Sequence, residues 1–297
     1  MNHSHIKNLI ALGYLVDESV ANLIENIDED NFYKLIEGLK KENIFLINNE
    51  VIKKILVRDV NIIKEFKSIK KFTMQDLIKN LNEKYEILKN ILIKRVDFSD
   101  LVSINKISDG SATIIGLVKE KNENSIVLED PTGDILVNIS NELIKKLSLD
   151  DVVAVSGKIS NKILTAEKLI FPDVPIRPVN YTKSSIKVAF SDNENFDVNY
   201  VFTKNSIVDK EKNKRYSVSN PYLVEIEGVL ILVLIGVEPM EALRKRYLKI
   251  ENTDFIIDNV PDIVFSDANL NLNYKGITIA SLNKVVDLKT REVYDLK

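Results

Sequence analysis

The sequence has no cysteine and no tryptophan, and its two histidines, His3 and His5, lie in the first five residues. The lack of cysteine excludes disulfide bonds and redox-active thiols. From residue 6 onward there is no imidazole or thiol, which excludes Ser-His-Asp and Cys-His catalysis and zinc sites built from Cys and His ligands. Any chemistry in this chain must therefore rely on Asp, Glu, Lys, Tyr, Ser or Thr.

Long apolar runs are missing as well. No run approaches the roughly 18 residues that cross a bilayer, and the N-terminal residues lack the pattern of a signal peptide. We therefore expect a cytoplasmic protein without a membrane partner. The chain carries 41 basic and 44 acidic side chains, a net charge of −3. Because proteins that bind phosphate backbones usually have a basic excess, this balance favours a protein partner over direct binding of nucleic acid.

Residues 1–56 are predicted to form a helical module, because apolar side chains recur at helical spacing. Asp17 and Ser19 are candidate caps of a second helix, and Asn31 is the candidate cap of a third. The composition is typical of a protein-interaction module. A DNA-binding helix-turn-helix is the alternative, although the third helix has no arginine and mixes acids with lysines.

Residues 57–97 are rich in lysine and predict a connector that contains one helix over residues 74–93. The charge run KSIKK at 67–71 is interpreted as a solvated tether, and a patch for backbone phosphates is the alternative. The segment carries no pattern typical of an enzyme domain.

Residues 98–172 predict a five-stranded β-barrel. Four strand-like stretches, one of which holds two strands, are separated by turn residues, and a short helix is expected over 141–147. Five strands with a helix between the third and fourth is the order of an OB fold. The stretch VLEDPTGDILV predicts a tight turn between two strands, in which Gly133 supplies a positive φ.

Single-stranded DNA binding by such a barrel needs aromatic platforms and basic residues along the backbone path. The segment has only Phe98 and Phe171 as aromatics, both at its ends, and eight lysines against eleven acids without arginine. Because each stacked base contributes roughly 1–3 kcal/mol, the barrel lacks the main source of affinity. The sequence therefore favours a protein-docking barrel.

Residues 173–297 predict an α/β domain that follows a proline-punctuated linker. Strands are expected over 222–227 and 229–236, and a helix over 239–248. Two further strands end at Asp192 and Asp267, and α/β enzymes often place metal ligands at such strand ends. The whole chain is thus predicted to be a multidomain α+β protein.

The stretches LEDPTGDI, VPIRPVN, VSNPYLVEIEGVLILVLIG and IIDNVPDIVFSDANLN together resemble the small (B) subunit of archaeal D-family DNA polymerase. They also resemble the B subunits of eukaryotic replicative polymerases. The resemblance runs nearly end to end and implies a helical module, an OB fold and a calcineurin-like phosphoesterase domain. In the archaeal family this domain holds two metal ions, has 3′–5′ exonuclease activity and carries motifs of the forms DxH, GNHD, YHG and GHxH.

The positions that match this metal site are Asp192, Glu194, Asn205, Ile235, Asp267, Ala268 and Leu270. Asp192 keeps the first carboxylate, but Glu194 stands in place of the DxH histidine. Ile235 replaces the histidine of the YHG motif, and Ala268 and Leu270 stand where the GHxH histidines belong. The resemblance therefore implies a shortened and inactive phosphoesterase domain, with no cofactor and no bound metal.

The leading hypothesis is a non-catalytic accessory subunit of a replicative DNA polymerase. Its partner would be the catalytic subunit of a D-family or B-family enzyme, in a hetero-oligomer that contacts DNA indirectly or weakly. By resemblance it would be archaeal and associated with the nucleoid. The alternatives are a stand-alone single-stranded-DNA-binding OB protein and a residual metal-dependent 3′–5′ exonuclease. An exonuclease would need an all-oxygen metal site, for which the candidate ligands are Asp192, Glu194, Asp262 and Asp267.

Overall fold

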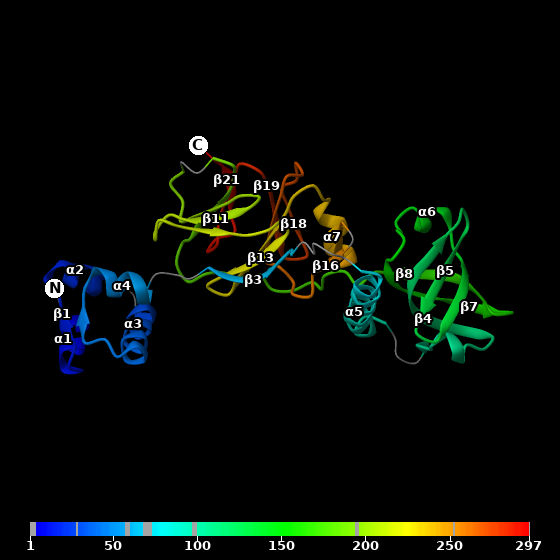
Figure 1. The fold of residues 1–297 in the computed structure, drawn as a ribbon, viewed down its shortest axis with the longest axis horizontal. Coiled ribbons are helices and arrows are strands. Elements are labelled where there is room, and N and C mark those ends of the chain that lie inside the picture. The colour runs from blue at the N-terminus through cyan, green and yellow to red at the C-terminus, as the bar shows by residue number, and fades with distance from the viewer. Residues whose placement is uncertain are drawn as a thin grey trace.

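The computed structural model describes residues 4–27, 29–56, 60–67, 73–96, 100–193, 196–251 and 253–296. His3, Phe98, Glu194 and most of the charge run at 67–71 lie outside these residues. Figure 1 shows a helical module at one end, a β-barrel at the other, and a larger β-rich domain between them. No described helix is both long enough and apolar enough to cross a membrane.

The N-terminal part is helical, as predicted. Its elements are α1 (Ser4–Ala11), β1 (Leu15–Val16), α2 (Glu18–Asn26), α3 (Glu29–Glu42), β2 (Leu46–Ile47) and α4 (Asn49–Leu56). The side chain of Asp17 accepts a hydrogen bond from the Ser19 amide, so Asp17 caps α2 as predicted. The prediction for Asn31 was wrong, because α3 begins at Glu29 and Asn31 lies within its first turn.

The closed barrel confirms the OB-type strand order. It is built from β4 (Gly110–Lys121), β5 (Ser125–Asp130), β6 (Gly133–Asn138), β7 (Val152–Ser160) and β8 (Ile163–Ile170). The strands follow the order β4-β5-β6-β8-β7 around the barrel, and α6 (Asn141–Ile144) lies between the third and fourth strands. Alternate side chains along each strand point into one apolar core. Gly133 has a φ of 157°, as the turn was predicted to require.

The C-terminal domain consists mainly of two six-stranded sheets that enclose a common core. The first sheet has the order β12-β11-β10-β9-β20-β21 and the second has the order β18-β19-β17-β14-β13-β3. The strands of the first are β9 (Lys187–Phe190), β10 (Tyr200–Phe202), β11 (Ser206–Asp209), β12 (Lys214–Ser217), β20 (Lys284–Asp287) and β21 (Val293–Asp295). Those of the second are β3 (Asn61–Glu65), β13 (Tyr222–Ile226), β14 (Val229–Leu234), β17 (Ile263–Ser266), β18 (Leu272–Tyr274) and β19 (Ile277–Ser281).

The connector takes part in this architecture, which the sequence analysis did not predict. Strand β3 pairs antiparallel with β13 and forms one edge of the second sheet. The predicted helix over 74–93 is present as α5 (Met74–Ile93), and a capping box between Thr73 and Asp76 begins it. A shared apolar cluster joins α5 to the barrel and to the C-terminal domain. The described part of the connector therefore belongs to the body of the protein.

The helix predicted over 239–248 is shorter than expected. Helix α7 (Pro239–Lys245) ends because Arg246 adopts a left-handed conformation with φ of 61°. The chain then forms an antiparallel pair, β15 (Tyr247–Ile250) with β16 (Thr253–Ile256). The prediction was wrong at this end because the residue that stops the helix is an arginine, without the glycine that usually marks such a stop.

Candidate functional site

The described residues that match the family's metal site lie near one edge of the two facing sheets. Strands β9 and β10 run parallel in one sheet, and β14, β17 and β19 run parallel in the other. Phe190 ends β9 and Phe202 ends β10, and their rings lie 5.6 and 5.8 Å from the ring of Phe265 in β17. The carboxyl ends of strands from both sheets therefore meet at this edge, above a buried aromatic cluster.

Two of the apolar replacements, Ile235 and Leu270, pack against apolar clusters beside this edge. Ile235 follows β14 and packs against the core between the sheets. Its amide donates to the Asn220 side chain over 3.1 Å. Leu270 packs against a neighbouring apolar cluster, and its amide donates to the Ala268 carbonyl over 2.7 Å. Hydrocarbon side chains thus occupy positions at which a metal site would need imidazoles.

The carboxylate of Asp267 is engaged by the backbone. Its two oxygens accept hydrogen bonds from the Gly236 amide at 2.9 and 3.1 Å. The contact joins the turn after β14 to the turn after β17. Asp267 therefore fixes two loops at the edge of the sheet, which accounts for an acid at this position without a metal.

Two further site positions are described. Asp192 is exposed and follows Ser191, whose hydroxyl donates to the Asn283 side chain over 2.9 Å. Asn205 lies in the turn between β10 and β11, where its amide donates to the Thr203 hydroxyl over 3.2 Å. Within the part of the chain that the structure describes, no group of three or more His, Cys, Asp and Glu side chains is arranged to hold a metal ion.

Asp262, one of the candidate ligands of an all-oxygen metal site, lies at the opposite end of β17 from Asp267. It precedes β17, whereas Asp267 follows it, so roughly 16 Å of extended strand separates them. The buried carboxylate of Asp262 forms an ion pair with Arg177 at 2.8 Å and accepts from the Leu230 amide over 2.8 Å. Asp262 is therefore a structural anchor for the linker that enters the C-terminal domain.

The DPTG turn of the barrel also has a structural role. The carboxylate of Asp130 accepts hydrogen bonds from the Ile104 amide at 3.0 Å and from the Thr132 amide at 2.7 Å. The Thr132 hydroxyl accepts from the Asn105 amide over 3.1 Å. These contacts hold a short 3₁₀ turn, η2 (Ile104–Lys106), against the barrel.

We expect Asp130→Ala to lower the free energy of unfolding by about 1–3 kcal/mol, because it leaves two backbone donors without their acceptor. The matched control is Asp134→Ala at the next strand, where the half-exposed carboxylate pairs with exposed Lys119. That control should cost less than about 1 kcal/mol. Urea unfolding of both variants, followed by circular dichroism, checks the difference. Equal effects would contradict the anchoring role of Asp130.

The barrel offers little to a stacked base. Phe171 is the single aromatic residue within 100–172, and the guanidinium of Arg244 lies 4.7 Å from its ring centroid. Phe171 also packs against the barrel core. This ring is therefore already occupied by contacts within the chain.

A buried ion pair holds α5 against the C-terminal domain. The Nζ of Lys84 lies 2.7 Å from the Oδ2 of Asp254, and both side chains are almost fully buried. Lys84 Nζ also lies 4.2 Å from the ring centroid of Tyr247. The Asn80 side chain accepts from the Asp254 amide over 3.1 Å. Sequence reasoning missed this pair, because 170 positions separate its members.

A second buried group links the C-terminal domain to the barrel. The hydroxyl of Tyr247 donates to Asp151 over 2.6 Å, and Lys245 pairs with the same carboxylate at 3.0 Å. Lys245 also donates to the Ser148 hydroxyl over 2.8 Å. With the Lys84–Asp254 pair, these contacts form an interdomain junction that ties barrel, α5 and C-terminal domain together.

Because of the buried Tyr247 hydroxyl in this junction, the free energy of unfolding should fall at alkaline pH. Burial, and then the neighbouring Asp151, raises the pKa of Tyr247. The contribution of the protonated Tyr247 hydroxyl to the free energy of unfolding is complete below the pKa of tyrosine in the unfolded chain, about 10. This contribution is lost as the pH rises above that value. While Tyr247 stays protonated in the fold, it contributes a slope of about −1.4 kcal/mol per pH unit to the free energy of unfolding. Urea unfolding between pH 9.5 and 11 should therefore show a shallower slope for Tyr247→Phe, and equal slopes would contradict this prediction.

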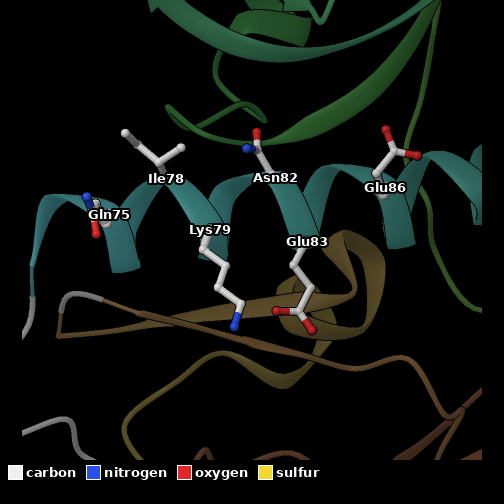
Figure 2. A pocket seen from close by; sticks show the side chains of 6 residues that line it. All are labelled: Gln75, Ile78, Lys79, Asn82, Glu83 and Glu86. Carbon is white, nitrogen blue, oxygen red and sulfur yellow. The ribbon is translucent and has the colours of Figure 1, made fainter.

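A shallow hollow runs along α5 near this junction. Its lining residues are Gln75, Ile78, Lys79, Asn82, Glu83 and Glu86. Figure 2 shows that Lys79 and Glu83 point to one side of the helix, while Ile78, Asn82 and Glu86 point to the other. These side chains of mixed charge point to two sides of the helix and present no convergent set of catalytic or metal-binding groups.

Comparison with known proteins identifies related sequences over part of the chain. It is 28% identical over 130 residues to the DNA polymerase II small subunit of Archaeoglobus fulgidus, which covers 41% of this chain and 26% of that protein. It is 34% identical over 113 residues to the DNA polymerase II small subunit of Methanothermobacter thermautotrophicus, which covers 34% of this chain and 23% of that protein. The chain thus spans about a quarter of the length of each relative.

No family model matches the chain. Among solved structures, telomere capping protein Ten1 from Saccharomyces pombe is 15% identical, with a TM-score of 0.20 over 24% of this chain and 77% of that one. A full-length MCM homolog from Methanopyrus kandleri is 9% identical, with a TM-score of 0.22 over 71% of this chain and 68% of that one. These low scores carry no argument. The two sequence relatives do support the resemblance seen in the motifs: this chain is similar to the small subunit of an archaeal D-family DNA polymerase.

Proposed function

We propose that the chain is a non-catalytic accessory subunit of a replicative DNA polymerase. The barrel and the C-terminal domain dock the catalytic subunit as one body, and DNA is contacted indirectly or weakly. The C-terminal domain is a shortened, calcineurin-like phosphoesterase domain that has lost its metal site. The complex is a hetero-oligomer in the archaeal cytoplasm, associated with the nucleoid.

The similarity to two polymerase small subunits is the observation that carries this proposal. The junction supports the docking role, because buried contacts from three parts of the chain hold the barrel against the C-terminal domain. A partner that contacts both the barrel and the C-terminal domain would therefore bind a surface whose geometry is already fixed. Preorganisation of this kind lowers the entropic cost of association.

The absence of catalysis is supported by the residues at the strand ends. A two-metal phosphoesterase clamps the attacking and leaving oxygens between two ions, which needs a convergent set of ligands. Here Ile235, Ala268 and Leu270 stand at three histidine positions of the family. The described Asp267 accepts from a backbone amide, and Asp192 is exposed.

A nuclease assay tests this part of the proposal. The purified chain should not degrade 5′-labelled single-stranded DNA in the presence of Mn²⁺, and Asp192→Ala should behave in the same way. Calorimetric titration with Mn²⁺ should show no stoichiometric binding. A degradation rate that Asp192→Ala abolishes would contradict the proposal and establish a rebuilt metal site.

Titration with labelled oligo-dT at low salt separates the docking subunit from a stand-alone single-stranded-DNA-binding protein. The barrel has no free aromatic platform in its described residues, so we expect no saturable binding at micromolar concentrations. Tight binding that weakens steeply with added salt would favour the DNA-binding alternative.

A further inference from the structure

The N-terminal module exposes an unusual share of apolar surface. In the described residues 17 large apolar side chains are exposed, and seven of these lie between Ile10 and Leu46. Two of the seven, Leu15 and Leu46, form what we call the β1–β2 patch. Their exposed fractions are 67% and 51%.

The patch is continuous because two short strands bring its residues together. Strands β1 and β2 are parallel, and Leu15 is the register partner of Leu46. The Leu15 amide also donates to the Phe45 carbonyl over 2.8 Å. Register partners in a parallel pair place their side chains on the same face, so Leu15 and Leu46 lie side by side toward solvent.

The opposite face of the same strands is covered. The next register pair, Val16 with Ile47, packs into the core of the helical module. Parallel strands occur almost only where both faces are covered, usually by helices. The β1–β2 patch is therefore a parallel sheet face that lacks its outer layer within the described chain.

The exposed apolar area of the patch indicates what kind of partner could cover it. The exposed fractions correspond to about 240 Å² if a fully exposed large apolar residue has about 200 Å². A stable interface between folded proteins buries about 800 Å² on each partner. The patch is thus too small for a stable dimer of this chain and matches one face of a short helix.

The charge of the module restricts the occupant further. Residues 1–56 contain nine acids and six lysines, so the module alone carries a net charge of −3. Asp17 and Glu18 are exposed and follow β1 directly. Basic residues beside an apolar stripe would complement this surface, whereas a nucleic-acid backbone would be repelled.

We propose that the β1–β2 patch binds a short amphipathic helix of a partner protein, with apolar residues spaced i, i+3/i+4 and i+7 and flanking lysine or arginine residues. The inference rests on the proposed function, because it assigns the module a protein partner other than the catalytic subunit. Its test uses the full chain alone. A failure of peptides to bind the patch and a failure of the chain to bind the catalytic subunit are therefore separate results.

The experiment pans a phage-displayed library of 16-residue random peptides against the immobilised full chain. Enriched peptides are then synthesised and titrated by fluorescence anisotropy. The test variant carries Leu15→Lys and Leu46→Lys, and the matched control carries Ile176→Lys, which is 85% exposed in the linker. Circular dichroism checks that each variant is folded.

The proposal expects enriched peptides with the amphipathic spacing and a net positive charge. The double variant should bind them at least about tenfold more weakly, while the Ile176→Lys control binds unchanged. No enrichment, or enriched peptides that bind the double variant equally well, would overturn it. A dimer of the wild-type chain that the double variant abolishes in sedimentation velocity would also overturn it, in favour of a second copy.

Discussion

Lys84→Ala is expected to lower the free energy of unfolding by about 3–5 kcal/mol. The substitution removes the ammonium that lies 2.7 Å from Asp254 and leaves that carboxylate buried without its ion-pair partner. It also removes the cation next to the Tyr247 ring. Because tryptophan is absent, urea unfolding followed by tyrosine fluorescence and circular dichroism is the suitable measurement.

Two controls separate the buried charge from other effects. The double variant Lys84→Met with Asp254→Leu removes both charges and should recover most of the loss, since apolar replacement of a buried pair is often neutral or stabilising. Lys249→Ala breaks the more exposed pair with Asp150 and should cost less than about 1 kcal/mol. A Lys84→Ala effect no larger than that of Lys249→Ala would contradict the role of the junction.

Arg177→Ala is expected to have the second-largest effect, a loss of about 3 kcal/mol or more. Asp262 is fully buried, and Arg177 is its nearer ion-pair partner at 2.8 Å, since Arg291 lies 3.9 Å from the same oxygen. Arg177 also donates to the carbonyls of Val260 and Pro261, at 3.1 and 2.7 Å. The guanidinium therefore fastens the linker to the start of β17, and its loss leaves an acid and two carbonyls without this donor.

The matched control is Arg95→Ala. Arg95 donates to the carbonyls of Pro172 and Asp173, both at 2.9 Å, and these contacts involve no buried carboxylate. This variant should lose only about 1–2 kcal/mol. Thermal unfolding of both variants at pH 7 checks the order. If Arg95→Ala were the more destabilising of the two, the buried Asp262 carboxylate would not be the cause.

The sequence predicted the elements whose signals are local. The barrel strands alternate apolar and polar residues, and the proline and glycine of the DPTG turn mark the connection between two of them. Strand β3 was missed because NIIKE lies in a lysine-rich stretch and gains stability from β13, far along the chain. Strands β10, β11 and β12 are three or four residues long, too short for a periodic signal.

From the sequence, the candidate site could be predicted only as a set of positions at which the family's metal ligands are replaced by other residues. Comparison with the family's motifs placed Ile235, Ala268 and Leu270 at histidine positions, but it did not show what the remaining acids bind. Asp262 and Asp267 lie at opposite ends of β17. Because of this, Asp262 forms an ion pair with Arg177, whereas Asp267 accepts from the Gly236 amide. The junction depends on charged side chains from distant segments, so no local pattern could have predicted it.

The proposed docking role is tested by sedimentation velocity of the full chain mixed with the large subunit of a D-family DNA polymerase from the same cells. We predict a stable one-to-one complex at micromolar concentrations that Asp192→Ala leaves unchanged. Independent sedimentation of the two proteins would contradict the docking role, and Mn²⁺-dependent degradation of DNA by the chain alone would contradict the loss of catalysis.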